Sequence, residues 1–170
     1  MNPLVGFYEG TGRDDRGRSL EDILRFDDDR IEDVHDFIQW LFPLPERSGA
    51  NPAAPILDEA AIASFRSRPE LRANLRRSLN RMLNFYGLTW LDARIVEAPS
   101  FPRRSSWLRA GDHNHLRLTR MLRSLHVLGE PQAARTLFAA LAEIYHNERN
   151  AERDRISERT FKFWENAIAE

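Results

Sequence analysis

The sequence HNHLRLTRMLRSL, residues 113–125, decides the fold class of this chain. Large apolar side chains recur here every three to four residues, at Leu118, Met121 or Leu122, Leu125 and then Leu128. This period is that of an α-helix with one buried face. Asp112 stands where a carboxylate caps a first turn, and Gly129-Glu130-Pro131 turns the chain after the helix. We therefore predict a helix that packs through its leucine stripe.

Helical periods continue on both sides of this segment. Upstream, Asp58 caps a helix that runs through Phe65, and Pro69 opens a longer helix that Gly87 ends. The stripe of the longer helix is Leu71, Leu75, Leu79, Met82 and Tyr86. Downstream, the predicted inward positions are Leu137, Phe138, Leu141, Ile144 and Tyr145 in the next helix, and Phe161, Trp164 and Ile168 in the last. The polar run His146–Arg155 between them is predicted to be solvated or an exposed helix end.

The N-terminal part has weaker patterns. Residues 1–17 are predicted to be irregular, and Ser19 with Asp22 forms the capping box of a short helix. One helix of about three turns, which Pro43 ends, is predicted from the spacing of Ile31, Val34, Ile38 and Leu41. The proline-rich residues 43–57 are a predicted linker.

Residues 88–111 contain prolines and serines and are predicted to form a long loop, with room for a short strand at Arg94-Ile95-Val96. Loops of this length are often functional, so we treat this one as a candidate lid. The predicted fold class is all-α: a single-domain orthogonal bundle of six to seven helices, spanning residues 1–170, with one long ordered loop.

The composition is that of a soluble globular protein, with 42% hydrophobic and 30% charged residues among 170. No apolar run approaches the length of a membrane span, which argues against a transmembrane receptor. The N-terminus lacks a secretory signal and the chain lacks cysteine, so we expect a cytoplasmic protein without disulfides or thiolate chemistry. A net charge of −1 argues against general binding of nucleic acid. Lys162 is the only lysine, a bias typical of a GC-rich, bacterial genome.

The best candidate site lies on the helix that residues 113–125 predict. His113, Arg117 and Arg120 share one helix face, with Asn114 and Arg123 beside it. First-turn amides, the helix dipole and two guanidinium groups together favour a small anionic ligand such as phosphate or carboxylate. The alternative is that the arginines pair with carboxylates of a neighbouring helix.

A second candidate site lies near the predicted helix that Pro43 ends. Trp40 either completes the core or, as an exposed indole beside Gln39 and Asp36, contacts a peptide or base. If His35 and His113 converge, a histidine pair with Asp36 could bind metal or act as acid and base. No metal-ligand spacing and no nucleophile motif is convincing, so we predict no catalytic residue, no metal and no cofactor.

Two segments carry a family resemblance. The segments are FIQWLFP, residues 37–43, and HNHLRLTRMLRSL, residues 113–125, with Phe85-Tyr86-Gly87 between them. In residue identity, order and separation they resemble the conserved domain of the opioid growth factor receptor family. The resemblance runs from Arg18 to the closing segment around Trp164. His115 departs from it, because the animal pattern has a second asparagine there. Animal members also carry long C-terminal extensions with repeats, so the resemblance implies no function that depends on those extensions.

The resemblance implies receptor activity toward an enkephalin-like peptide. Such a peptide needs carboxylates for its amine and an aromatic wall, for which Asp33, Asp36 and Trp40 are the nearest candidates. We therefore expect a non-catalytic module that binds a peptide, a protein or another ligand. The alternative is an enzyme or binder of a phosphorylated or nucleotide ligand acting through His113, Arg117 and Arg120. A third class, nucleic-acid binding, would use a basic helix face that consists of Arg72, Arg76, Arg77 and Arg81.

Overall fold

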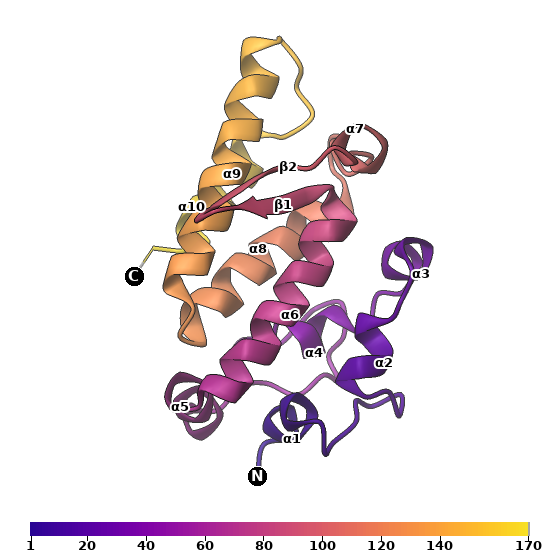
Figure 1. Ribbon diagram of the computed structural model, residues 1–170, viewed down its shortest axis with the longest axis vertical. Helices are drawn as coiled ribbons and strands as arrows, with labels where there is room; N and C mark the ends of the chain where they lie inside the picture. Colours follow the sequence, from indigo (N-terminus) through magenta and orange to yellow (C-terminus); the bar gives the residue numbers. More distant parts are fainter. Residues whose placement is uncertain (170) are drawn as a thin grey trace. The chain divides into compact units, whose positions relative to one another are not determined.

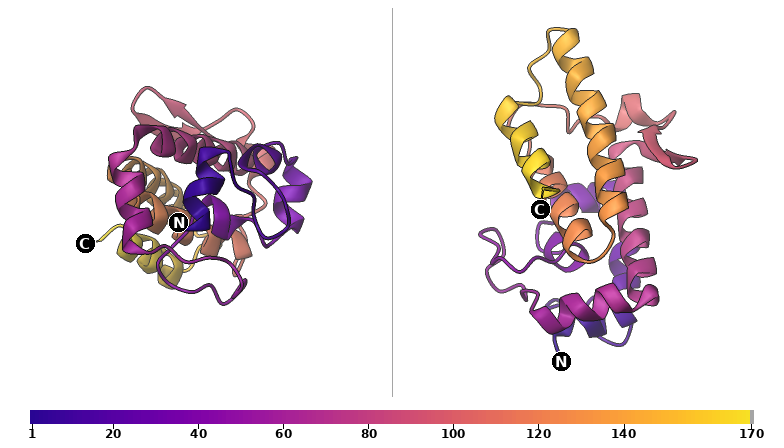
Figure 2. Two further views of the ribbon diagram at one scale, coloured as in Figure 1. Left: turned by 90° about the horizontal axis from the view of Figure 1, so that it is seen from below. Right: turned by 90° about the vertical axis from the view of Figure 1, so that its left-hand side faces the viewer.

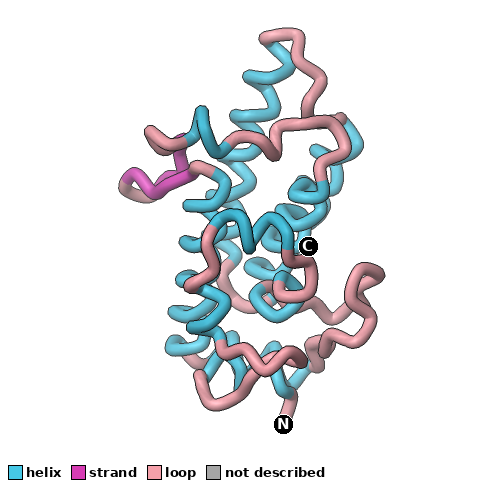
Figure 3. Tube along the Cα trace, turned by 90° about the vertical axis from the view of Figure 1, so that its right-hand side faces the viewer, coloured by secondary structure: helices cyan, strands magenta, loops and turns pink. Residues whose placement is uncertain are grey.

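The computed structural model describes residues 1–169 and confirms an all-α fold with one small β-hairpin (Figures 1 and 3). The chain forms two compact units. Unit one consists of residues 1–81 and 127–129, and unit two of residues 82–126 and 130–170. That the two units make one domain remains a prediction. No helix among the described residues has the length and apolar character of a membrane span.

Unit one contains five helices and the start of a sixth within its described residues: α1 (Pro3–Glu9), α2 (Leu20–Leu24), α3 (Asp28–Asp33), α4 (Ile38–Leu41), α5 (Glu59–Ser67) and most of α6 (Pro69–Tyr86). Ser19 and Asp22 form the expected capping box on α2, and Asp58 caps α5 through a hydrogen bond from the amide of Ala61. The apolar stripe predicted for α6 is fully buried. Local capping and apolar period therefore define these helices correctly.

The expectation of an irregular N-terminus is wrong, because Pro3–Glu9 forms α1. Asn2 accepts a hydrogen bond from the amide of Leu4, and Pro3 occupies the first turn, where its missing N–H costs nothing. The hydroxyl of Tyr8 is buried and hydrogen-bonded to Ser78 of α6 and to the carbonyl of Leu41. Burial raises the pKa of this phenol far above its ordinary value, so it stays protonated.

The single helix predicted over residues 31–41 is also wrong, since the chain forms α3 and α4 with a break between them. Val34 is extended, with φ −92° and ψ 129°. Beyond it, the carboxylate of Asp36 is held by the guanidinium groups of Arg16 and Arg18 at 3.1 and 2.9 Å. These ion pairs fix the connection outside a helix. Residues 43–57 contain no helix or strand, and their role as a linker remains a prediction.

Unit two contains the end of α6, the hairpin of β1 (Leu88–Leu91) and β2 (Arg94–Glu97), α7 (Phe101–Arg104), all but the last residue of α8 (His113–Val127), α9 (Pro131–Asn150) and α10 (Glu158–Ala167). The hairpin strands are antiparallel, with Leu91 opposite Arg94 and Asp92 at φ 53° in the turn. β2 lies against α9, and α10 packs along the same helix (Figure 2). Helix α8 begins directly after Asp112 and buries its leucine stripe, as predicted.

Half of the long loop predicted over residues 88–111 instead forms strands and a short helix, β1, β2 and α7. The strand expected at residues 94–96 is present, but it pairs with a strand that we did not predict. Gly87 joins α6 to this hairpin with φ +76°, and a Cβ added there would lie 2.8 Å from the Cα of Phe101. Only glycine combines that backbone conformation with so close an approach. The helix count of six to seven is also too low, because the described residues form ten helices. Five of these, α1, α2, α3, α4 and α7, have only four to seven residues.

Candidate functional site

The first turn of α8 is built around two buried polar side chains. Asp112 accepts a hydrogen bond from the amide of Asn114 at 2.9 Å and one from the guanidinium of Arg109 at 3.1 Å. The amide oxygen of Asn114 accepts from the hydroxyl of Tyr86 and from Arg117, both at 3.3 Å. Asn114 is 1% exposed and Arg117 is 5% exposed. Such burial favours a structural role for this pair over contact with a freely diffusing anion.

His115 joins three segments of unit two, a role that the sequence did not reveal. Its Nε2 lies 2.8 Å from the carbonyl oxygen of Trp107, and its own carbonyl accepts a hydrogen bond from the indole of Trp164 at 3.1 Å. The imidazole ring meets both indole rings edge-on, with centroids 6.3 and 5.9 Å apart. Burial lowers the pKa of His115 below its ordinary value, although the Trp107 carbonyl opposes the shift. The neutral ring therefore donates Nε2–H to that carbonyl.

His113 and Arg120 are both partly exposed, and the helix of α8 puts them on the face of Arg117, as expected from their spacing. The other four predicted site residues, His35, Asp36, Gln39 and Trp40, belong to unit one. A role for either group in ligand binding remains a prediction.

Trp40 belongs to the core of unit one rather than to its surface. Its side chain is 3% exposed, packs against the ring of Phe7 at 5.3 Å and donates its indole N–H to Asp15 at 3.2 Å. Gln39 is equally buried and donates to the carbonyl of His35 at 3.4 Å. His35 itself is exposed, whereas Asp36 is held by Arg16 and Arg18. The core alternative for Trp40 is therefore favoured.

The basic face of α6 is engaged in contacts within unit one. Arg77 binds Glu21 through both terminal nitrogens, at 2.6 and 3.0 Å. Arg81 binds Asp28 at 2.9 Å and the carbonyl of Phe26 at 2.8 Å. Arginines that are paired in this way offer fewer charges to nucleic-acid phosphates.

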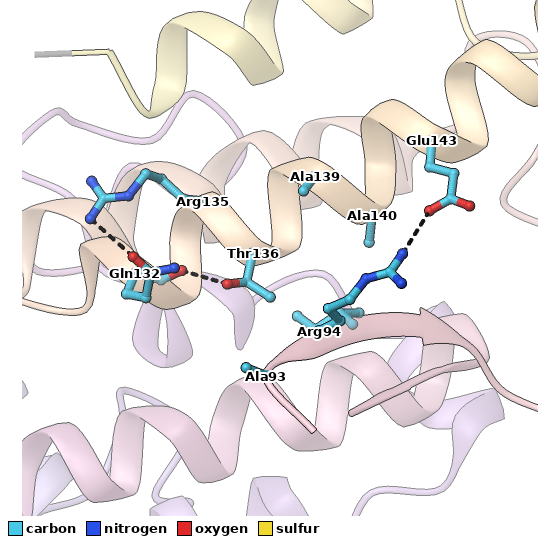
Figure 4. A pocket seen from close by; sticks show the side chains of 9 residues that line it. Ala93, Arg94, Gln132, Arg135, Thr136, Ala139, Ala140 and Glu143 are labelled. Carbon is cyan, nitrogen blue, oxygen red and sulfur yellow. Dashed lines mark hydrogen bonds and ion pairs between the residues drawn. The ribbon is translucent and has the colours of Figure 1, made fainter. Parts of the chain in front are cut away.

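A groove runs between the β-hairpin and α9, and we call it the hairpin groove (Figure 4). Its first part is a hollow of about 200 Å³. The residues around this part are Ala93, Arg94, Ile95, Gln132, Arg135, Thr136, Ala139, Ala140 and Glu143. Arg94 points from β2 toward α9 and reaches Glu143 at 3.7 Å, while Arg135 donates to Gln132 at 3.3 Å. Charged and amide groups thus surround small alanine side chains.

The second part of the hairpin groove is a hollow of about 280 Å³ that shares Ile95, Ala140 and Glu143 with the first. Leu88 and Ile144 add apolar surface, whereas Glu97 and Asn147 add polar groups. Burial raises the pKa of Glu97, and the charges of Glu143 and Glu148 raise it further. This end of the groove therefore has a negative potential that favours a cationic group.

Glu148 stabilises the end of α9 beside the groove, within the run that we expected to be solvated or an exposed helix end. Its carboxylate is buried and binds Arg155 at 2.6 and 2.7 Å and Arg153 at 3.0 Å. The hydrogen bonds from Arg155 are the main cause that lowers the pKa of Glu148. The segment after α9 is thus fixed by a charged clamp, which explains its order.

The hairpin groove could not be predicted from the sequence because it depends on contacts between segments that are distant in the chain. The signals that could have indicated it are two short runs with aromatic and β-branched residues, 88–91 and 94–97, separated by the two residues Asp92-Ala93, and the adjacent small residues Ala139 and Ala140 on α9. Mixed polar groups over an apolar floor, held on regular elements, are what binding grooves require. Geometrically, the groove suits a short extended segment.

Comparison with known proteins decides the family. Residues 12–169 match the opioid growth factor receptor (OGFr) conserved region. The chain belongs to this family. Two relatives are the opioid growth factor receptors of Mus musculus, 40% identical over 119 residues, and of Homo sapiens, 38% identical over 134 residues. The opioid growth factor receptor-like protein 1 of Xenopus tropicalis is 36% identical over 118 residues.

These alignments cover 66%, 75% and 66% of this chain in that order, but only 19%, 20% and 23% of the relatives. The chain thus spans about a fifth of the length of the OGFr proteins that it matches. No solved structure matches it. The segments that carried the family resemblance are mainly core: Phe37–Phe42 is buried throughout, and His115 links the two tryptophans.

Proposed function

We propose that this OGFr domain is a non-catalytic binding module that holds an extended segment of a peptide or protein in the hairpin groove. The observation that supports the proposal is the groove itself. It has an apolar floor and charges of both signs, and it lies between the β-hairpin and α9. The Mus musculus and Homo sapiens relatives of this chain are named opioid growth factor receptors, and that name supports a binding role for the domain.

The dimensions of the groove support a short peptide segment. Gln132 and Asn147 mark its ends on α9, fifteen residues apart, which corresponds to about 22 Å of helix. An extended chain covers that distance with about seven residues. A bound segment of this length would contact Arg94 and Arg135 near one end and Glu97 near the other.

The charges also favour one direction of binding. Glu97 and Glu143 suit an amino terminus or a basic side chain, whereas Arg135 suits an acidic side chain or a carboxyl terminus. The residues first considered for the amine are less suitable, because Asp36 is already bound by two arginines and Trp40 is buried. The alternative, a phosphorylated ligand on His113, Arg117 and Arg120, has less support because Arg117 is buried.

The test is selection of peptides from a random hexapeptide display library, with an enkephalin peptide as a defined additional probe. Ala139→Trp fills the groove from an exposed position, so it should abolish capture of any selected peptide. Ala60→Trp is the matched control, since Ala60 is an exposed helical alanine of α5. Equal capture by both variants, or no enrichment by the native domain, would contradict the proposal.

A further inference from the structure

Unit one contains a hollow of about 420 Å³ between α2 and α3, which we call the arginine hollow. It is lined by Arg18, Asp22, Arg25, Phe26, Asp27 and Arg30. Three guanidinium groups thus surround one small space, with the buried ring of Phe26 as its wall. The hollow belongs to a different unit from the hairpin groove, and its chemistry is independent of the function proposed above.

Arg18 is the fixed part of the arginine hollow. Its side chain is 14% exposed and binds Asp14 at 2.6 Å and Asp36 at 2.9 Å. Its guanidinium carbon lies 5.7 Å from the centroid of the Phe26 ring. These contacts hold the residue in place and balance its charge.

Arg25 and Arg30 are the available part. Both are exposed, and in the described residues neither guanidinium group donates a hydrogen bond or forms an ion pair within 4 Å. The Arg30 guanidinium carbon lies 4.1 Å from the centroid of the Phe26 ring, which orients the group beside the hollow. The hollow therefore has one guanidinium group that Phe26 orients, that of Arg30, and a second at its edge, that of Arg25, and the N–H donors of both are available.

The two aspartates of the hollow are engaged with backbone amides instead. Asp22 accepts from the amide of Ser19 at 2.8 Å and from Arg13 at 3.4 Å. Asp27 accepts from the amide of Arg30 at 2.8 Å. Because these carboxylates cap short helices, they leave the donors of Arg25 and Arg30 to an external acceptor.

We propose that the arginine hollow binds a phosphoryl group. A phosphoryl group offers several acceptor oxygens, so it can bind two guanidinium forks at the same time, and each such charge-assisted pair is directional. The source is either free inorganic phosphate or a phosphate monoester. Asp22 and Asp27 reduce the positive potential of the site, so the expected dissociation constant is about 1 mM.

The experiment follows the arginine Nε–Hε signals of ¹⁵N-labelled protein during titration with inorganic phosphate and, separately, with phenyl phosphate at constant ionic strength. The signals of Arg25 and Arg30 should shift and saturate. Arg25→Gln with Arg30→Gln should weaken binding at least about tenfold, the loss of one strong contact. Arg25→Lys with Arg30→Lys keeps the positive charges but not the planar guanidinium groups. Its affinity should therefore lie between those of the native protein and of the glutamine variant.

Arg103→Gln with Arg159→Gln is the control, because it removes the same charge from exposed arginines of unit two and should leave the affinity unchanged. Binding of inorganic phosphate alone would support a free-ion site, and tighter binding of phenyl phosphate would support a monoester. The proposal would be overturned if the folded double variant Arg25→Gln with Arg30→Gln kept its affinity. It would also be overturned if the Nε–Hε signals of the native protein did not shift at about 20 mM of either probe.

Discussion

The imidazole Nε2 of His115 lies 2.8 Å from the carbonyl oxygen of Trp107, and this contact ties α8 to the segment that follows α7. Trp107 in turn donates its indole N–H to the carbonyl of Tyr86 at 3.1 Å, at the end of α6. The His-Asn-His sequence at the start of α8 thus holds together the core of unit two. Its stability should depend on the protonation of His115.

Acid should weaken the protein through His115. Its pKa is lowered in the folded state, so the unfolded chain binds a proton more readily. The stabilising contribution is complete above about pH 6.5, the ordinary pKa of histidine, and is lost as the pH falls through the lower folded value. His115→Gln should flatten the pH dependence of the free energy of unfolding below pH 6.5, as measured by urea denaturation.

The clamp on Glu148 should be worth a measurable part of the stability. Glu148→Gln leaves two arginines without their carboxylate, and we expect a loss of about 1–3 kcal/mol in the free energy of unfolding. Glu165→Gln breaks the exposed pair with Lys162, so it should cost less than about 0.5 kcal/mol. Equal losses of unfolding free energy in denaturant titrations of the two variants would show that the clamp stabilises the protein no more than an exposed ion pair does.

Gly87 should tolerate no side chain. Gly87→Ala adds a Cβ at 2.8 Å from the Cα of Phe101 and keeps φ at +76°, so we expect a loss of about 2 kcal/mol or more. Gly49→Ala meets nothing within 4 Å and requires no positive φ, which makes it the matched control. Thermal unfolding of the two variants provides the comparison, and a stable Gly87→Ala would contradict the close approach.

Glu97 should determine which end of a peptide the groove accepts. Glu97→Gln removes one of the two carboxylates proposed to hold an amino terminus, so a selected peptide with a free amine should bind about tenfold more weakly. N-acetylation of the same peptide should weaken binding to the native domain by a similar factor, and the two changes together should not add. Calorimetric titration measures the affinity of the native domain and of Glu97→Gln for the free and for the acetylated peptide. If the two losses add, the amine of the peptide does not bind at Glu97.

Sequence patterns predicted the elements that depend on neighbouring residues. The capping box of Ser19 and Asp22, the stripe of α6 and the start of α8 after Asp112 are examples, because caps and apolar period act within a few residues. The break between α3 and α4 was missed, since it depends on Arg16 and Arg18 holding Asp36 from about twenty residues away.

The candidate site was harder to predict for the same reason. The exposed or buried state of Trp40 and Arg117 is set by tertiary packing, which helix period alone does not define. The hairpin groove needs β2 to lie against α9, some forty residues later in the chain. Its acidic end likewise joins Glu97 of the hairpin with Glu143 of α9.

Whether the hairpin groove holds a peptide can be measured by amide chemical-shift mapping of the domain with a selected hexapeptide. Binding in the groove predicts that the largest shifts fall on Arg94–Glu97 of β2 and on α9 between Gln132 and Asn147. Shifts concentrated on His113, Arg117 and Arg120 of α8, with the groove unaffected, would contradict it.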